Sequence, residues 1–369
     1  MRLGVLLMNT GTADAATVPA IRAYLDQFLM DPAIISAPYP IRRFVVNRIL
    51  KTRPEATLPR YRNFYTQEGS PFIRTCAQQA ILLQHVLEAR FGLVAGKSNV
   101  EGAAGAQADF TGRNQVDLVA GAQSDPVTAV KVVSAMRYGN PSLRAGLKEL
   151  WKFEADQVVL LPAYPQEVKV CTGTCLKAAS KELDRLRRDV NWSPFVVECG
   201  SFYADPAWRE ALAQQVEAHW DHRTPEGVHE AGAKLLVSFH STLVKDIRAG
   251  DPYEGQVQET VKNLVADLGI PEEDVILCYQ SRFDNRKWLQ PLAPAVAHDL
   301  AKQGVQDVAV VCPGFVAENM ESALEIGVDL RNEFQTASTS GARMTYVPCL
   351  NDDSGLIQAF ANCVIRALE

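Results

Sequence analysis

Short apolar runs alternate along the chain with longer segments in which apolar residues recur at helical spacing. The runs that predict buried strands are 3–8, 127–138, 157–161, 234–239, 275–279 and 308–312. The segments that predict helices are 17–30, 72–91, 142 to about 153, 205–220, 255–268 and 314–334. Because buried strands and helices alternate, the pattern predicts an α/β fold built on doubly wound parallel sheets.

The strand predicted at 234–239 stops at a histidine, His240, and a polar segment with the turn sequence Gly250-Asp251-Pro252-Tyr253 follows it. In open α/β sheets, ligands bind beyond the carboxyl ends of the strands. An imidazole at that point is therefore a candidate for proton transfer near neutral pH. The alternative is that His240 caps its strand and hydrogen-bonds a carbonyl group.

Three acidic residues, Glu321, Glu325 and Asp329, follow one another at four-residue spacing in the helix predicted at 314–334. Like charges at this spacing destabilise a helix slightly, and the helix dipole compensates only for Glu321 near the N-terminus. The row is either a solvated acidic face or a path for a cation. If the strand 308–312 lies beside the strand that ends at His240, such a path leads to the imidazole.

Two stretches depart from the alternating pattern. Within 31–65, apolar positions 41, 44, 45 and 49 share one helical face with arginines beside them. Such a segment lies on a membrane surface, covers an apolar anionic ligand, or packs on the core as an ordinary surface helix. The stretch 92–126 is Gly-rich and unpatterned, which predicts an inserted loop.

Composition narrows the class of protein. A chain of 369 residues suggests two domains, and the net charge of -6 argues against a nucleic acid partner. The N-terminal apolar run is too short for a signal sequence, and no run of about 18 apolar residues predicts a membrane span. Eight cysteines without regular spacing favour reduced, mostly buried thiols in the cytoplasm over a disulfide framework.

Taken together and in order, the short motifs of the chain resemble the ferrochelatase family. The matching motifs are Leu6-Leu7-Met8-Asn9, Phe28-Leu29 with Asp31-Pro32, Gly69-Ser70-Pro71, Met136-Arg137-Tyr138-Gly139, Tyr164-Pro165-Gln166, His240-Ser241, Gly250-Asp251-Pro252-Tyr253, Gln280-Ser281-Arg282, Trp288-Leu289 with Pro291, and Phe315 through Glu321 to Glu325. Each motif is weak alone, but the ordered set covers nearly the whole chain except about 92–126.

The resemblance implies insertion of ferrous iron into a porphyrin, with protoporphyrin IX expected, in haem biosynthesis. It implies two similar chelatase-type domains with a cleft between them, which we place at 1–163 and 164–351, the C-terminal helix 352–369 packing back on the first. No cofactor is expected beyond the substrate iron. The stretch 33–53 corresponds to an apolar lip at the pocket mouth, where peripheral membrane contact is expected; the oligomeric state is left open.

The same resemblance assigns roles to individual residues. His240 and Glu321 are expected to be catalytic, and the metal is expected to meet His240, Glu321, Glu325 and Asp329. The residues expected to line the macrocycle pocket are Thr10, Arg137, Tyr138, Ser281, Trp288 and Phe315.

The chain departs from the family pattern at several positions. Leu243 stands where a proline is common, Asn319 replaces a usual histidine, and Thr10 is no strong axial ligand. Some members hold a [2Fe–2S] cluster through one mid-chain cysteine and a C-terminal trio. Only Cys349 and Cys363 lie near the C-terminus here, so a cluster is not expected; Cys171 or Cys175 would be its mid-chain ligand.

Two other functions stay open at this point. One is metal insertion into coproporphyrin or another tetrapyrrole; Thr10 and the Arg137-Tyr138 pair favour protoporphyrin. The other is a non-catalytic protein that binds or senses a tetrapyrrole. The acidic row favours the enzyme, because a binding protein does not need a cation path, and a free-base porphyrin must lose two protons as the metal enters.

Overall fold

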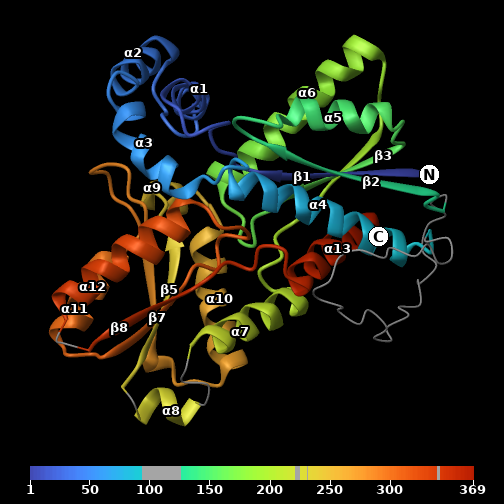
Figure 1. Cartoon of the computed structure of the whole chain (residues 1–369). Helices are drawn as coiled ribbons and strands as arrows, with labels where there is room; N and C mark the ends of the chain where they lie inside the picture. The colour runs from blue at the N-terminus through green and yellow to red at the C-terminus, as the bar shows by residue number, and fades with distance from the viewer. Residues whose placement is uncertain (94–125, 221–224, 231, 339–340) are drawn as a thin grey trace.

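The computed structural model describes residues 1–93, 126–220, 225–230, 232–338 and 341–369 (Figure 1). The strands are β1 (Arg2–Asn9), β2 (Ala129–Met136), β3 (Gln157–Pro162), β4 (Phe195–Glu198), β5 (Lys234–His240), β6 (Val275–Gln280), β7 (Asp307–Val311) and β8 (Arg343–Val347). The α-helices are α1 (Val18–Leu29), α2 (Tyr39–Ile49), α3 (Arg53–Phe64), α4 (Pro71–Arg90), α5 (Leu143–Lys152), α6 (Thr174–Val190), α7 (Pro206–His219), α8 (Pro225–Glu230), α9 (Val244–Arg248), α10 (Tyr253–Leu268), α11 (Ala293–Lys302), α12 (Arg331–Ala337) and α13 (Ser354–Leu368). A 3-10 turn, η2 (Glu272–Asp274), and two π-helices, η1 (Lys169–Gly173) and η3 (Met320–Leu330), complete the described elements.

The eight strands form two parallel sheets with the same topology. The first sheet has the order β2-β1-β3-β4, and the second has the order β6-β5-β7-β8. In both, the first strand lies second in the sheet, between the next two strands along the chain. The predicted doubly wound α/β architecture is therefore confirmed, and β7 lies directly beside β5, as the cation-path hypothesis requires.

The two sheets also match in register at the ends of their first strands. The N–H of Met136 donates to Pro141 O, and the N–H of Tyr279 donates to Pro291 O, so these two positions are equivalent. Their partners on the central strands are Asn9 and Phe239. The next residue in each half, Thr10 or His240, therefore occupies the same place at the carboxyl end of its sheet.

One apolar core runs continuously between the two sheets. The core cluster contains side chains of β1 and β3 and of β5 and β7, together with residues of α4, α7, α10 and α13. Separate clusters cover the outer face of each sheet, under α5 and α6 in the first half and under α11, η3 and α12 in the second. Both sheets are thus covered on both faces, which explains why their strands are continuously apolar.

Most predicted elements are observed with ends shifted by one or two residues. The short strands β4 and β8 were not predicted; β4 is a four-residue strand at the edge of its sheet, with exposed ends that weaken the apolar signal. Because β4 pairs with β3, the first sheet takes its edge strand from beyond the predicted boundary at 163. The C-terminal helix α13 packs on α4 and α7 (Figure 1).

The helix predicted at 314–334 is wrong in its start and in its type. A loop follows β7, and the helix begins only at Met320 as a π-helix that continues into α12. Asn319 sets this start, because its Oδ1 accepts from the N–H groups of Glu321 and Ser322, both at 2.9 Å. Residue spacing alone does not distinguish a π-helix from an α-helix.

The segment 33–53 contains α2, whose apolar side chains point in two directions. Tyr39, Ile41 and Phe44 are exposed, whereas Arg42 and Val46 are buried. The predicted apolar face at 41 and 44 therefore faces outward and does not pack on the core. The predicted loop 92–126 lies, but for its ends, outside the described residues.

Candidate active site

His240 is the last residue of β5 and has a defined tautomer. Its Nδ1 lies 2.7 Å from the carbonyl oxygen of Ser241, which can only accept, so Nδ1 carries a proton. In the neutral ring, Nε2 is then the acceptor. The hydroxyl of Tyr253 donates to the backbone oxygen of His240 at 3.0 Å and holds the strand end in place. The predicted carbonyl contact is thus present, and it orients the ring for proton acceptance.

Glu321 lies at the start of η3, within electrostatic reach of His240. Burial raises the pKa of its carboxyl above the usual range, the nearby His240 and Arg60 oppose that rise, and Glu325 adds to it. A carboxylate in such surroundings gains from a positively charged neighbour, because little solvent screens the pair. The two predicted catalytic residues therefore belong to one electrostatic unit.

Gln280 joins the elements beneath this pair, a role that the sequence did not reveal. Its buried side chain accepts from the Ser238 hydroxyl at 2.8 Å and donates to the backbone oxygen of Glu321 at 2.8 Å. It connects β5 and β6 with η3. The only available signal was its place in the Gln280-Ser281-Arg282 motif, at the carboxyl end of a predicted strand.

The acidic row continues outward along η3 with each carboxylate in a different environment. Glu325 accepts from Ser281 twice, from the backbone N–H at 2.8 Å and from the hydroxyl at 2.6 Å. Asp329 is 44% exposed and pairs with Arg60 of α3 at 2.6 Å. The row therefore runs from the half-buried Glu321 to Asp329 at the surface, where Arg60 of the first half meets it.

The described residues contain no group of three His, Cys, Asp or Glu side chains arranged to hold a metal ion. His240, Glu321 and Glu325 interact electrostatically, but they do not form a closed coordination cage in this arrangement.

The predicted pocket residues of the first half are held by partners of their own. The hydroxyl of Thr10 lies 2.7 Å from that of Tyr164. Arg137 forms an ion pair with Asp31, and its guanidinium lies 4.5 Å from the ring centre of Tyr138. Tyr138 is only 3% exposed, and its hydroxyl donates to the same carboxylate at 2.9 Å. Asp31 is thus the anchor of this group, and the sequence indicated it only through the matched first-half pattern.

Comparison with known proteins settles the family. The model of the family described as Ferrochelatase matches residues 2–105 and 107–368. The chain belongs to the ferrochelatase family. A protein named ferrochelatase from Marinobacter nauticus is 32% identical over 369 residues, covering all of this chain and 87% of that protein. Another from Bordetella pertussis is 34% identical, again over the whole chain and 89% of that protein.

Similarity to solved structures is weaker. The sirohydrochlorin chelatase SirB from Bacillus subtilis subspecies spizizenii, in complex with cobalt, is 11% identical over this whole chain and 95% of that one, with a TM-score of 0.46. A match at this level carries no argument about activity. The description of the fold of this ferrochelatase-family chain therefore rests on its own two parallel sheets.

Aromatic side chains gather beside His240 in this ferrochelatase-family protein. Trp288 is buried and donates its indole N–H to Asp284 at 3.0 Å. The ring of Phe283 lies between Trp288 and His240, with centroids 5.7 and 5.5 Å away. Phe315 is half-buried and packs against the outer core of the second half.

Glu318 is a further polar residue that sequence reasoning missed. Its carboxylate accepts from the Tyr346 hydroxyl at 2.9 Å, from the N–H of Cys349 at 2.8 Å and from the Ser322 hydroxyl at 2.7 Å. These contacts fix the loop before η3 against the end of β8. All eight cysteines are free, and seven are buried, as the prediction of mostly buried thiols expects.

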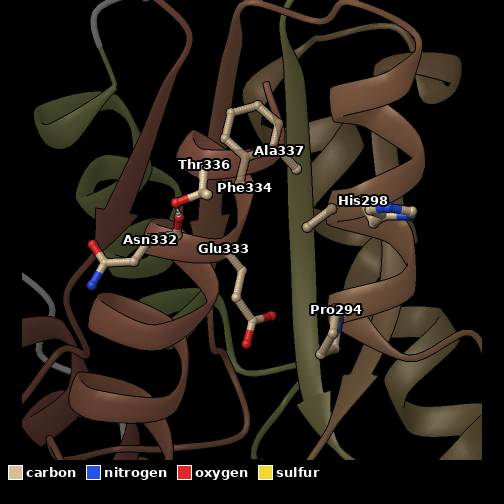
Figure 2. A pocket seen from close by; sticks show the side chains of 8 residues that line it. Pro294, His298, Asn332, Glu333, Phe334, Thr336 and Ala337 are labelled. Atoms are coloured by element: carbon tan, nitrogen blue, oxygen red, sulfur yellow. Dashed lines mark hydrogen bonds between the residues drawn. The ribbon is translucent and has the colours of Figure 1, made fainter. Parts of the chain in front are cut away.

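A hollow of about 570 Å³ lies away from these residues, between α11 and α12 (Figure 2). Pro294 and His298 line it from α11, and Asn332, Glu333 and Thr336 line it from α12. It contains none of the predicted site residues.

No helix within the described part of the chain is both long and apolar enough to cross a membrane.

Proposed function

We propose that the protein inserts ferrous iron into protoporphyrin IX, with His240 and Glu321 as the central pair. The observation that carries this proposal is an imidazole of defined tautomer at the carboxyl end of β5 whose charge acts on the half-buried carboxylate of Glu321. Membership of the ferrochelatase family supplies the reaction, and the geometry supplies roles for the residues.

His240 accepts the pyrrole protons. A free-base porphyrin carries two inner N–H groups, and both protons leave as Fe²⁺ takes their place. Because Nδ1 donates to Ser241, each proton goes to Nε2 and passes from there to solvent before the next is taken. Glu321 stabilises the imidazolium that forms, which is the usual function of a carboxylate beside a general base.

The acidic row conducts the cation toward the macrocycle. Carboxylate oxygens replace the water ligands of a divalent ion one after another. Asp329 meets the hydrated ion at the surface, Glu325 takes it next, and Glu321 releases it beside the porphyrin. Ser281 holds both oxygens of Glu325 and so keeps this carboxylate facing along the row.

The macrocycle is bound by apolar walls and a polar rim. Trp288, Phe315 and Tyr138 supply flat apolar surface, which suits a planar tetrapyrrole. Arg137 sits at the rim and pairs with a propionate in exchange for part of its contact with Asp31. Thr10, at the place equivalent to His240 in the first half, faces the opposite side of the cleft.

The test is anaerobic incubation with Fe²⁺ and either protoporphyrin or coproporphyrin, following the absorbance change on metallation. We expect both kcat and kcat/KM to favour protoporphyrin. Faster turnover of coproporphyrin would replace the substrate in this proposal. Tight binding of either porphyrin without metallation would favour the non-catalytic alternative.

Membrane contact through 33–53 stays a prediction, supported by the exposure of Tyr39, Ile41 and Phe44.

A further inference from the structure

The correspondence between the two halves extends beyond their first strands. Leu7 on β1 lies opposite Leu161 on β3, and the equivalent Val237 on β5 lies opposite Val311 on β7. Both β3 and β7 then lead, through loops of similar length, into a π-helix, η1 or η3, that continues as an α-helix. The first half therefore has a counterpart of the element that carries the acidic row.

Two thiols occupy the places of two carboxylates in this counterpart. Counted from the paired strands, Cys171 is equivalent to Glu321, and Cys175 is equivalent to Glu325. Thr10, at the end of β1, already occupies the place of the imidazole. The first half thus presents two sulfur atoms and a hydroxyl where the second half presents two carboxylates and a histidine ring.

The side chains of this thiol cluster, Thr10, Tyr164, Cys171 and Cys175, interact with one another. The Thr10 hydroxyl lies 2.7 Å from that of Tyr164, which in turn lies 3.8 Å from the Sγ atom of Cys175. Thr10 also interacts with the Cys171 thiol, and the two thiols lie within electrostatic reach of each other. Cys175 is buried, whereas Cys171 is only half-buried. The cluster is therefore reached from the Cys171 side.

The surroundings of the thiol cluster admit a positive charge. Asp251 lies within electrostatic reach of Cys171 and attracts a cation there. Arg137, which acts on Cys175, is already paired with Asp31. Sulfur ligands select soft metal ions, whereas carboxylate oxygens suit harder ones. The two halves therefore offer donor sets of opposite preference at equivalent places.

We infer that Cys171 and Cys175, with the Thr10 and Tyr164 hydroxyls beside them, form a second metal site that binds a soft divalent d10 cation. Binding forms a metal–sulfur bond to each cysteine and breaks its S–H bond, and both protons pass to solvent. Because the cluster supplies only two sulfur ligands, hydroxyl or water oxygens complete the four-coordinate set that such ions take. The inference is independent of the proposed reaction, since neither thiol belongs to the acidic row.

The probe is Cd²⁺, titrated into the metal-free full chain and followed by the ultraviolet charge-transfer band of cadmium thiolates. We expect one Cd²⁺ per chain to produce the band. Cys171→Ser and Cys175→Ser should each raise the Kd at least about tenfold, and the double variant should lose the band. The matched control Cys199→Ser removes a buried thiol elsewhere and should leave the Kd unchanged. Glu325→Gln, at the equivalent place in the second half, should also leave the band unchanged.

Alkylation of the wild type gives a second measurement that does not depend on the folding of any variant. Of the eight cysteines, all within the described residues, only Cys171 is not buried. Iodoacetamide should therefore modify Cys171 first, and Cd²⁺ should protect it, as mass spectrometry of the peptides will show. The inference is overturned if the wild type gives no thiolate band, if the band survives in the double variant, or if Cd²⁺ does not slow alkylation of Cys171.

Discussion

At the scale of residues, the two candidate catalytic groups, His240 and Glu321, each depend on one local interaction. The Ser241 carbonyl selects the tautomer of the imidazole, and burial makes the Glu321 carboxyl sensitive to the charge of its neighbour. Each residue alone has an ordinary structural explanation. His240 ends β5, and Glu321 lies in η3, which follows the neighbouring strand β7; this proximity is what favours a shared catalytic role.

We expect His240→Ala to lower kcat by about 10² to 10⁴ while free-base porphyrin still binds, since binding rests on the apolar walls. Glu321→Gln keeps the shape, removes the charge, and should also be severe. Members of one catalytic unit are not additive, so the double variant should be hardly slower than the slower single variant. The measurement is kcat with Zn²⁺ or Fe²⁺ and excess porphyrin. Losses that multiply would show that the two residues act separately.

Gly11 follows Thr10 in the loop after β1, and its backbone explains why no side chain fits there. Its φ is +94°, and a Cβ would lie 1.9 Å from the carbonyl oxygen of Tyr138. Gly69 has a similar φ of +97° but open space around it. Comparing the same substitution at Gly11 and at Gly69 therefore separates the free-energy cost of backbone strain from that of a steric clash.

We therefore expect Gly69→Ala to cost about 1 to 2 kcal/mol, the strain of a left-handed residue. Gly11→Ala should cost more than about 3 kcal/mol, because the clash with backbone cannot be relieved by a rotamer change. Urea unfolding of both variants measures the difference. Equal losses would mean that the loop shifts to accept the methyl group.

At the scale of elements, the start of β6 is tied to β5 by a buried carboxylate. Asp274 accepts from Lys234 Nζ at 2.5 Å, and His229 Nδ1 lies 3.0 Å from its other oxygen. Burial works to raise the pKa of Asp274, but these hydrogen bonds and charges outweigh it, so the pKa is lowered from its ordinary value. An acid with a lowered folded-state pKa stabilises the fold above its unfolded pKa and loses that contribution as pH falls through the folded value.

We expect Asp274→Asn to lower the free energy of unfolding by about 1 to 3 kcal/mol at neutral pH. The gap from the wild type should shrink as pH falls below about 4, the unfolded range of an aspartate, because the wild type then loses the same charge. The control is Asp184→Asn, whose exposed pair with Arg187 should contribute less than about 1 kcal/mol. Denaturant titrations at several pH values measure the free energy of unfolding of each variant. A difference between the wild type and Asp274→Asn that persists at low pH would assign the effect to packing.

The element that carries the acidic row is a π-helix capped by Asn319. π-Helical turns are rare and occur frequently at functional sites. Here the element places Glu321 beside His240 and Glu325 beside Ser281, while Glu318 fixes the preceding loop. The asparagine that departs from the family pattern thus has a structural role as a helix cap.

At the scale of the whole molecule, one core joins the two sheets. Residues of α13 lie at its centre, between α4 and α7, and Phe360 is fully buried there. Gln79 of α4 adds a polar link, because its amide donates to the backbone oxygens of Val316 and Asn351 in the second half. The halves share their interior and should not unfold independently.

We expect Phe360→Ala to lower the free energy of unfolding by about 3 to 5 kcal/mol, through lost burial and the cavity left behind. The transition should stay single, since both sheets depend on the same core. Phe44→Ala removes a ring of the same size from an exposed position and should have little effect. Calorimetry and near-UV circular dichroism measure the outcome; two separated transitions would show that the halves are thermodynamically independent.

Local pattern predicted six of the eight described strands, because burial on both faces leaves an uninterrupted apolar signal, and it predicted the helices α1, α4, α5, α7 and α10. It also placed His240 at the end of a strand and Glu321 in the helical segment that follows a later strand. The short edge strands β4 and β8 were not predicted, because they contain few buried residues. The π-helix was not predicted, because its hydrogen-bond pattern produces no distinct spacing of residues in the sequence.

Tertiary structure alone decided which side chains meet around the candidate site. That Ser281 holds Glu325, that Asp31 holds Arg137 and Tyr138, and that Phe283 reaches both His240 and Phe28 depends on contacts between segments far apart in the chain. A sequence records which groups are present and where its strands end. Which groups meet depends on strand order and on the shared core, because packing brings distant segments together. The number of residues between two groups along the chain does not indicate how far apart they lie in the folded protein.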